Sequence, residues 1–268
     1  VGTLTPSFAL AVSGTSDGSY TGSGSNATGI SSVVLQVNDG TTGWVDNATF
    51  TAPSGGGTAY TVTAAALTSG TTYSVRALVT DLATNTVTSA LSTTSGRITV
   101  DTTAPTPGTL TMTSTDTGSA SNDGIVNNAT PAFSLSTATD TAYTGMAHPT
   151  AAIATVTLET SLDSGANWVT NATFTAPTSP ATAYTVTAAS LATNTTYKIR
   201  ARVTDTAGNS ATTDLSTTSA TIVIDTTAPT AGTLAIVDTN GTTADGVVST
   251  ATPAFTVSGS ADTGYTGA

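Results

Sequence analysis

The sequence predicts an all-β fold made of antiparallel β-sandwiches repeated in tandem. The pentapeptide Asp-Thr-Thr-Ala-Pro occurs at residues 101–105 and again at residues 225–229, and self-similarity at a fixed period is typical of repeat proteins. Apolar and polar residues alternate in short runs between Gly, Pro, Asn and Asp turns, which is the pattern of half-buried strands. Thr and Val, which favour strands, are abundant, and no stretch has helical periodicity.

The repeat is most evident in the half that precedes each pentapeptide. Residues 44–105 align with residues 168–229 without a gap, and 40 of the 62 aligned positions are identical. Copies this close imply one shared fold. Further upstream, two motifs each occur three times: Thr-Pro-x-Phe at residues 5–8, 130–133 and 252–255, and Asp-x-x-Tyr-Thr-Gly at residues 17–22, 140–145 and 262–267.

These motifs also fix the phase of the repeat, because Val1 aligns with Val126 and with Val248. We therefore expect residues 1–105 to form a repeat that lacks its first strand, and residues 106–229 to form a complete repeat. Residues 230–268 would supply the first two strands of a third repeat. Two explanations remain open: a window cut from a longer chain, which we favour, or strand donation between subunits.

The second copy shows the strand pattern most clearly. In residues 197–204, Tyr197, Ile199, Ala201 and Val203 share one face, and the basic side chains between them share the other. The same alternation predicts further strands at residues 131–135, 156–160, 183–188 and 222–225. Several short strands at turn-punctuated spacing favour a sandwich.

A seven-residue motif makes the fold more specific. Residues 67–73 and 191–197 both read Leu-x-x-x-Thr-x-Tyr, which resembles the signature of fibronectin type III and related immunoglobulin-like (Ig-like) domains. The resemblance implies that Tyr73 and Tyr197 pack at a corner of the sandwich, with the hydroxyl bonded to nearby backbone. It also implies that Trp44 and Trp168 help to fill the core.

A longer pattern points to a class of proteins. Asp-Thr-Thr-Ala-Pro followed by Asp-Thr-Gly and by Asp-Gly-Ile-Val-Asn-Asn-Ala-Thr-Pro, through Pro131, resembles the bacterial Ig-like repeats of giant secreted adhesins and biofilm matrix proteins. The resemblance covers essentially the whole chain. It implies Ig-like/FnIII-like sandwiches arranged end to end in a stalk or filament, outside the cell or on its surface.

The composition excludes several other classes. Five Lys and Arg residues face sixteen acidic ones, and the net charge is −11, so phosphate backbones and anionic lipid would repel the chain. There is no Cys, and the one histidine, His148, excludes a multi-histidine metal site. No apolar run approaches membrane-spanning length. A Ser or Cys triad would need His148 as its only possible base, so we expect no enzyme. The charge and the short apolar runs lead us to expect no nucleic-acid partner and no membrane insertion.

Aspartates at the expected junctions form the candidate metal site. Asp101 ends the last strand of the first repeat, and Asp116 and Asp123 follow in the opening segment of the second; Asp225, Asp238 and Asp245 repeat this arrangement one period later. Converging carboxylates would repel one another without a cation, and Ca²⁺ prefers oxygen ligands of this kind. In the adhesins that the chain resembles, Ca²⁺ at such junctions stiffens the stalk, and Pro105 and Pro229 would limit the linkers further. The alternative is that these aspartates only form turns.

Two other features have mainly structural interpretations. Residues 161–168 match the pattern Ser-x-Asp-x-Gly-x-x-Trp, called the Asp box, which stabilises a hairpin turn and marks no active site. The basic face formed by Lys198, Arg200 and Arg202 could bind an anion, but a solvated sheet face is favoured. In the fibronectin strand order, Glu159 would lie beside Arg200 and pair with it.

Together these observations predict a non-enzymatic structural module of a bacterial surface or matrix protein, stiffened by calcium. Its partners would be neighbouring repeats, or copies of itself in a fibre or surface array. The alternative is an Ig-like adhesion module whose loops or Thr-rich face bind surface glycans or a receptor. Near-identical copies disfavour this alternative, because the recognition domains of adhesins usually differ from the repeated stalk.

Overall fold

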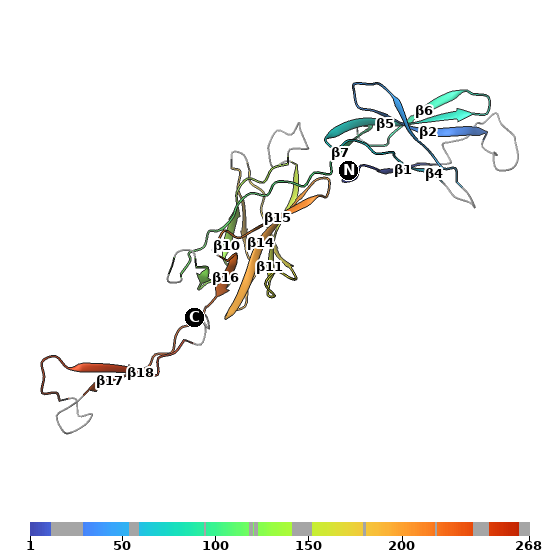
Figure 1. The fold of residues 1–268 in the computed structure, drawn as a ribbon. Helices are drawn as coiled ribbons and strands as arrows, with labels where there is room; N and C mark the ends of the chain where they lie inside the picture. The colour runs from blue at the N-terminus through green and yellow to red at the C-terminus, as the bar shows by residue number, and fades with distance from the viewer. Residues whose placement is uncertain are drawn as a thin grey trace. The chain divides into compact units, whose positions relative to one another are not determined.

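The computed structural model describes residues 1–11, 29–53, 59–93, 95–117, 120, 123–140, 152–178, 181–217, 219–237 and 247–262 (Figure 1). All regular secondary structure in these ranges is β-strand, and the strand pairs are antiparallel with few exceptions. The predicted all-β class is therefore confirmed. Within the described residues, no helix is long and apolar enough to cross a membrane.

The chain divides into two compact units. The first comprises Val1–Pro107, Ala138–Thr155 and Val203–Ala211, and the second comprises Gly108–Thr137, Val156–Arg202 and Thr212–Ala268. Several unit boundaries fall inside strands: β11 (Ile153–Ser161), β14 (Thr195–Asp205) and β15 (Ser210–Asp214). The domain limits at residues 105 and 229 stay a prediction from the sequence repeat.

The first copy of the repeat forms two sheets. In the larger, β2 (Ile30–Asn38) lies between β3 (Val45–Thr49) and β5 (Thr71–Asp81), and β5 also pairs with β6 (Thr86–Ala90) and β7 (Arg97–Val100). The smaller sheet pairs β1 (Ser7–Ala11) with β4 (Ala59–Thr63). Alternate residues of both sheets point inward, so Val33, Leu35, Tyr60, Val62 and Val75 share one buried core.

The second copy repeats this plan with additional strands. Its larger sheet has the order β12 (Val169–Thr173), β11, β14, β16 (Thr221–Ile224) and β9 (Ile125–Val126), with β15 also on β14. Its smaller sheet has the order β13 (Tyr184–Thr187), β10 (Ala132–Leu135) and β8 (Leu110–Met112). The strands predicted at residues 131–135, 156–160, 183–188, 197–204 and 222–225 are all present within a few residues of their expected limits.

The remaining strands form one hairpin. β17 (Thr233–Val237) and β18 (Ala254–Ser258) pair in antiparallel register, and Thr230 bridges Ala261. The equivalent bridge in the second copy joins Thr106 to Thr139. Two paired strands therefore lie within residues 230–268, and their assignment to a third repeat stays a prediction from the sequence.

Matching hydrogen bonds show that the two copies share one fold. Asp101 N donates to Val1 O at 2.9 Å, and one period later Asp225 N donates to Val126 O at 2.9 Å. The tyrosine corner also occurs twice, since the Tyr73 hydroxyl accepts from Thr68 N at 3.1 Å and the Tyr197 hydroxyl accepts from Ala192 N at 3.0 Å. The alignment of Val1 with Val126 and the role of the two tyrosines are confirmed.

The two tryptophans lie elsewhere than expected. Trp44 is 38% exposed, and Trp168 is only half-buried. Each ring stacks on a guanidinium group, Arg76 on Trp44 and Arg200 on Trp168, both at 4.0 Å from the ring centroid. The prediction that they fill the core is therefore wrong, because a ring face beside a cation on the polar side of the sheet is already a favourable site.

Candidate metal centre

Asp101 directly follows β7 and is completely buried, with 0% of its surface exposed. Its Oδ1 accepts a hydrogen bond from Thr103 N at 2.9 Å, which forms a local Asx-type turn. Its Oδ2 receives no hydrogen bond from the described residues. A buried carboxylate oxygen without a donor is costly, so this atom calls for a positive partner.

Asp205 ends β14 and is 1% exposed. Its Oδ1 accepts from Ala207 N at 2.8 Å and from Asn209 N at 2.9 Å, and its Oδ2 accepts from Asn209 Nδ2 at 2.9 Å. Asn209 Nδ2 also donates to the backbone oxygen of Asp101 at 3.0 Å. This turn therefore fixes Asp205 and connects it to the segment that carries Asp101.

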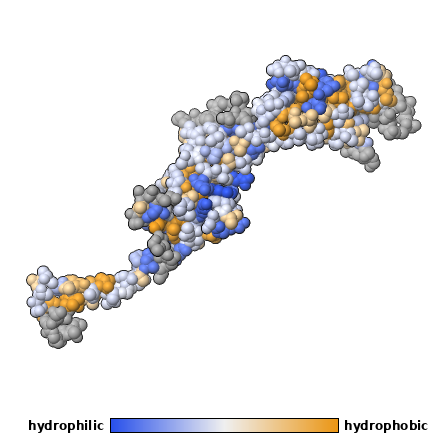
Figure 2. Space-filling view, viewed as in Figure 1, coloured by the Kyte–Doolittle hydropathy of each residue, from blue (hydrophilic) through white to orange (hydrophobic). Residues whose placement is uncertain are grey.

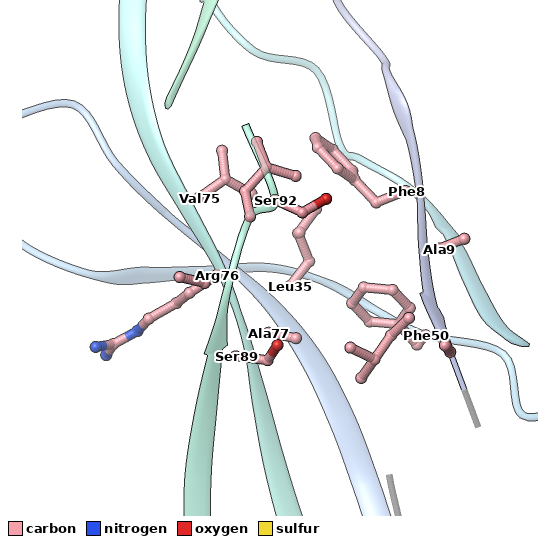
Figure 3. A pocket seen from close by; sticks show the side chains of 13 residues that line it. Phe8, Ala9, Leu35, Phe50, Val75, Arg76, Ala77, Ser89 and Ser92 are labelled. Atoms are coloured by element: carbon pink, nitrogen blue, oxygen red, sulfur yellow. The ribbon is translucent and has the colours of Figure 1, made fainter. Parts of the chain in front are cut away.

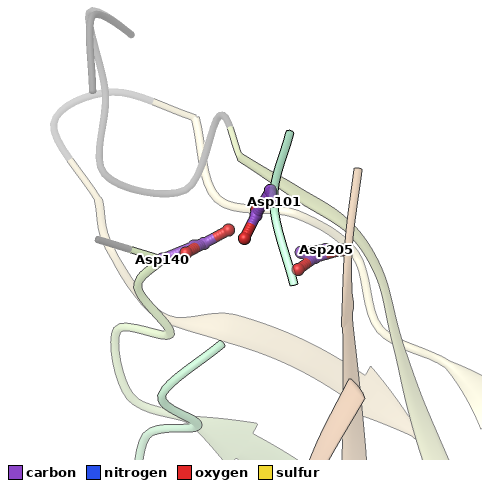
Figure 4. A group of neighbouring side chains, drawn as sticks. All are labelled: Asp101, Asp140 and Asp205. Atoms are coloured by element: carbon purple, nitrogen blue, oxygen red, sulfur yellow. The ribbon is translucent and has the colours of Figure 1, made fainter. Parts of the chain in front are cut away.

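Asp140 completes the group from a third segment of the chain and is half-buried. Asp101, Asp140 and Asp205 each offer a carboxylate oxygen, and these three oxygens all lie within 4.8 Å of one another. Figure 4 shows Asp140 and Asp205 on either side of Asp101. All three belong to the first compact unit, although they are far apart in the sequence.

The geometry of this group suits a hard divalent cation. Two oxygens on opposite sides of a Ca²⁺ ion lie about 4.8 Å apart, because each Ca–O bond is about 2.4 Å long. One ion could therefore contact all three carboxylates. Each carboxylate oxygen that accepts one hydrogen bond keeps a second lone pair for a metal. The charge argument agrees, since three anions at this separation, two of them buried, repel strongly unless a cation lies among them.

The site residues predicted from the sequence fall into three groups. Asp101 is in the cluster. Asp116 and Asp123 lie in the second unit, where Asp116 Oδ2 accepts from Gly124 N at 2.9 Å and Asp123 accepts from Ile125 N and Ala120 N at 3.1 and 3.0 Å. These are the contacts of turn-forming aspartates, the alternative considered above.

The third group lies one period later. Asp225 Oδ1 accepts from Thr227 N at 3.0 Å, which is the turn that Asp101 makes with Thr103. Asp238 and Asp245 lie outside the described residues. Metal binding by Asp116, Asp123, Asp225, Asp238 and Asp245 stays a prediction.

Sequence reasoning missed Asp140 and Asp205, although the repeat carries a signal for both. Asp140 opens the Asp-x-x-Tyr-Thr-Gly motif, which recurs at Asp17 and Asp262. Asp205 aligns with Asp81, which makes the same turn, because Asp81 Oδ1 accepts from Asn85 N and Oδ2 from Asn85 Nδ2, both at 2.7 Å. Folding was needed to show that these two aspartates meet Asp101.

On the basic face of β14, the contacts of Arg200 are with neighbouring side chains of the sheet. Arg200 Nε donates to Glu159 Oε2 at 2.6 Å, which confirms the predicted pair, and the Trp168 ring covers the same guanidinium group. The Asp box forms its expected turn, with Asp163 accepting from Asn167 N at 2.8 Å and from the Ser161 hydroxyl at 2.6 Å.

Comparison with known proteins finds one structural similarity to report. No family model matches the chain, and no curated protein matches it. Among solved structures, the chain is similar to chicken CNTN1 FN1–FN3 domains at 13% sequence identity, with a TM-score of 0.23; the match covers 88% of this chain and 69% of that one.

Proposed function

We propose that the chain is a non-enzymatic structural module, a length of the stalk or filament of a bacterial extracellular or cell-surface protein. The observation that supports this is the duplication itself. Two copies of one sandwich keep the same backbone bonds at the strand ends and the same tyrosine corner. In a spacer, reach depends on the number of copies, so selection would maintain such copies without a distinct active site.

Calcium is the cofactor in this proposal. The ion would bind Asp101, Asp140 and Asp205 and so tie the end of the first copy to two loops of the second. Asp101 Oδ2, which is buried and receives no hydrogen bond from the described residues, supports this role. A cation that connects three distant segments restricts their relative motion, and it adds stability because it binds only the folded chain.

The stiffening can be measured directly, because the sequence contains no Cys. Spin labels at Thr88→Cys and Thr170→Cys, both exposed strand positions, would report the distance between the two copies. We expect the distance distribution to narrow when Ca²⁺ is added and to broaden again in EGTA. A distribution that Ca²⁺ leaves unchanged would refute the stiffening.

Calcium binding itself has a matched control. Asp205→Asn and Asp81→Asn weaken the same kind of turn, but only Asp205 lies in the cluster. In titration calorimetry we expect the natural chain to bind Ca²⁺ with a Kd in the range of about 10⁻⁴–10⁻³ M, as extracellular modules do. Asp205→Asn and Asp140→Asn should lose this binding, and Asp81→Asn should keep it. If Asp81→Asn also lost Ca²⁺ binding, the loss would come from weakening a turn of this kind and not from removing a ligand of the cluster.

Partners follow from the same proposal. They would be neighbouring repeats, or further copies of the chain in a fibre or surface array, outside the cell. Recognition of surface glycans or of a receptor is the competing function, and a glycan array screened with the intact chain tests it. A saturable glycan signal would contradict a pure spacer.

A further inference from the structure

The turn that carries Asp205 has two counterparts in the described residues. The three turns span residues 81–85, 163–167 and 205–209, and each begins with Asp and ends with Asn. In each, the asparagine donates twice to its own aspartate, from the backbone N to Oδ1 and from Nδ2 to Oδ2, at 2.6–2.9 Å. These two bonds are therefore the part that the local turn itself supplies.

Among the described residues, the third turn alone bonds to another segment through its asparagine amide. Asn209 Nδ2 also donates to Asp101 O at 3.0 Å. Asn209 is half-buried, whereas Asn85 and Asn167 are exposed and bond from Nδ2 within their own turns. A side-chain amide has two N–H donors. Asn209 therefore uses one on the side chain of Asp205 and the other on the backbone of Asp101.

The same turn is in close contact with the first copy at a second point. A Cβ atom on Gly2 would lie 2.5 Å from Ala207 O, so no side chain fits at residue 2 without a shift of the backbone. Gly2 and the turn belong to the same compact unit. The turn is therefore held in place twice, by the contact at Ala207 and by the amide of Asn209.

We propose that Asn209 is a positioning residue of the calcium site, which couples the Asp205 carboxylate to the backbone of Asp101 so that both ligands are in place before the ion binds. The inference rests on the proposed calcium function. Figure 4 shows the two carboxylates beside each other. Asp205 receives hydrogen bonds at both oxygens, and the buried Asp101 Oδ2 receives none from the described residues. Partners of this kind orient metal ligands, and losing one typically lowers metal affinity about 10–100-fold.

The apolar groove of the first copy offers no comparable ligands. In Figure 3, the guanidinium group of Arg76 points away from Phe8 and Phe50, which line the groove. In the part of the chain that the structure describes, no Asp, Glu or His lines it. The three aspartates of the cluster are instead close enough to share one ion. The effect of changing Asn209 is therefore expected at this cluster.

Titration calorimetry of the intact chain with Ca²⁺ tests this role, and the first copy supplies the control. Asn209→Ala removes both bonds of the amide, whereas Asn85→Ala removes the turn bond alone. We expect the Kd for Ca²⁺ to rise about tenfold or more in Asn209→Ala and to stay unchanged in Asn85→Ala. An unchanged Kd in Asn209→Ala, or an equal rise in Asn85→Ala, would overturn the proposal.

A second variant, Asn209→Asp, separates hydrogen-bond donation from charge. It keeps nearly the same shape and adds a negative charge, but it places an acceptor where the natural chain has a donor, 2.9 Å from Asp205 Oδ2 and 3.0 Å from Asp101 O. A positioning role predicts weaker Ca²⁺ binding in spite of the added charge. Tighter binding would overturn the proposal, because the residue would then contribute charge or a ligand oxygen.

Thermal melting distinguishes positioning from a merely structural role. Lost turn stability lowers the Tm equally in Ca²⁺ and in EGTA, whereas lost positioning reduces the increase in Tm that Ca²⁺ produces. At one fixed Ca²⁺ concentration, we expect a smaller increase in Asn209→Ala than in the natural chain or in Asn85→Ala. An increase equal to that of the natural chain would count against positioning.

The natural chain provides a readout that needs no folded variant. In NMR, the side-chain amide protons of Asn209 should shift on adding Ca²⁺, with the Kd found by calorimetry, and those of Asn85 should not. The absence of a shift at Asn209 would overturn the proposal. A natural chain that binds no Ca²⁺ would refute the calcium function and this inference with it. Natural binding together with an unchanged Kd in Asn209→Ala would overturn this inference alone.

Discussion

At the scale of single residues, local turns determine the ionisation of the exposed aspartates. The pKa of Asp163 is lowered from 3.8 to about 2, because Asn167 N and then the Ser161 hydroxyl donate to its carboxylate. Asp39 in the first copy is lowered to about 2 as well, by the amides of Thr41 and Thr42. Both turns therefore depend on the charged form of an aspartate.

The first prediction concerns pH. A carboxylate whose pKa is lower in the folded state contributes stability that is present above the unfolded pKa and is lost as the pH falls towards the folded pKa. The free energy of unfolding should therefore decrease as the pH falls from about 4 to about 2, which are the unfolded and folded pKa values of Asp163 and Asp39. Chemical denaturation across this range measures it, and Asp163→Asn should make the dependence shallower. An Asp163 carboxyl that titrates near 3.8 by ¹³C NMR would contradict the explanation.

The second prediction concerns the tyrosine corner. Tyr197→Phe keeps the buried ring and removes the hydroxyl that accepts from Ala192 N. We expect a loss of about 1 kcal/mol of unfolding free energy, the usual net value of a neutral hydrogen bond. Tyr73→Phe should cost about the same, because its hydroxyl makes the equivalent bond to Thr68 N. A change near zero in both variants would show that water replaces the hydroxyl.

At the scale of strands, a similar arrangement on the outer sheet face occurs in both copies. In the second copy, the buried Glu159 accepts from Arg200, and Trp168 stacks on the guanidinium group. In the first, Gln36 Oε1 accepts from Arg76 Nε at 2.8 Å, and Trp44 stacks on it. The arginine therefore has a neutral acceptor in the first copy, and the amide of that acceptor donates to Asp46 Oδ1 at 2.7 Å, where the second copy has Thr170.

The third prediction follows from this comparison. Glu159→Gln should change stability by less than about 1 kcal/mol, because the amide oxygen can accept as Gln36 does. Arg200→Met should cost about 1–3 kcal/mol, because it leaves the buried Glu159 without its cation and also removes the ring stack. Urea denaturation of both variants gives the comparison. If Glu159→Gln were the more damaging variant, the charge itself would be essential.

At the scale of the whole molecule, the β17–β18 hairpin exposes apolar side chains that are buried in the second copy. Leu234, Phe255 and Val257 are 67%, 59% and 63% exposed, whereas their equivalents Leu110, Phe133 and Leu135 are almost completely buried. Figure 2 shows the apolar surface along these two strands. A two-stranded hairpin without a covering sheet is at best marginally stable in water.

The fourth prediction is that deleting residues 230–268 leaves the Tm of the remaining chain almost unchanged, because so little apolar surface of the hairpin is buried. Differential scanning calorimetry on both chains is the measurement. A marked drop in Tm would mean that the hairpin stabilises the two sandwiches. Hydrogen exchange of the full chain should agree, with fast exchange at Leu234 and Val257 and slow exchange at Leu110 and Leu135.

The sequence by itself determined the features that depend on local pattern. Alternation along residues 197–204 predicted β14, and the duplicated Leu-x-x-x-Thr-x-Tyr motif predicted both tyrosine corners, because a strand's buried face and a turn's hydrogen bonds are set by residues that are neighbours in the chain. The repeat alignment likewise predicted that Val1 and Val126 are equivalent, and the backbone oxygen of each accepts from the aspartate that follows the last strand of its copy.

Only the tertiary structure decided which distant residues meet. The sequence singled out Asp101 but placed Asp116 and Asp123 beside it, because they are near in the chain; folding instead brings Asp140 and Asp205 within 4.8 Å. The tryptophans are a second case, since their large apolar area suggested the core. Each instead lies beside a guanidinium group from β5 or β14, two strands away in the sheet, on the outer face. Strand pairing joins residues about a hundred positions apart, and no local pattern encodes that proximity.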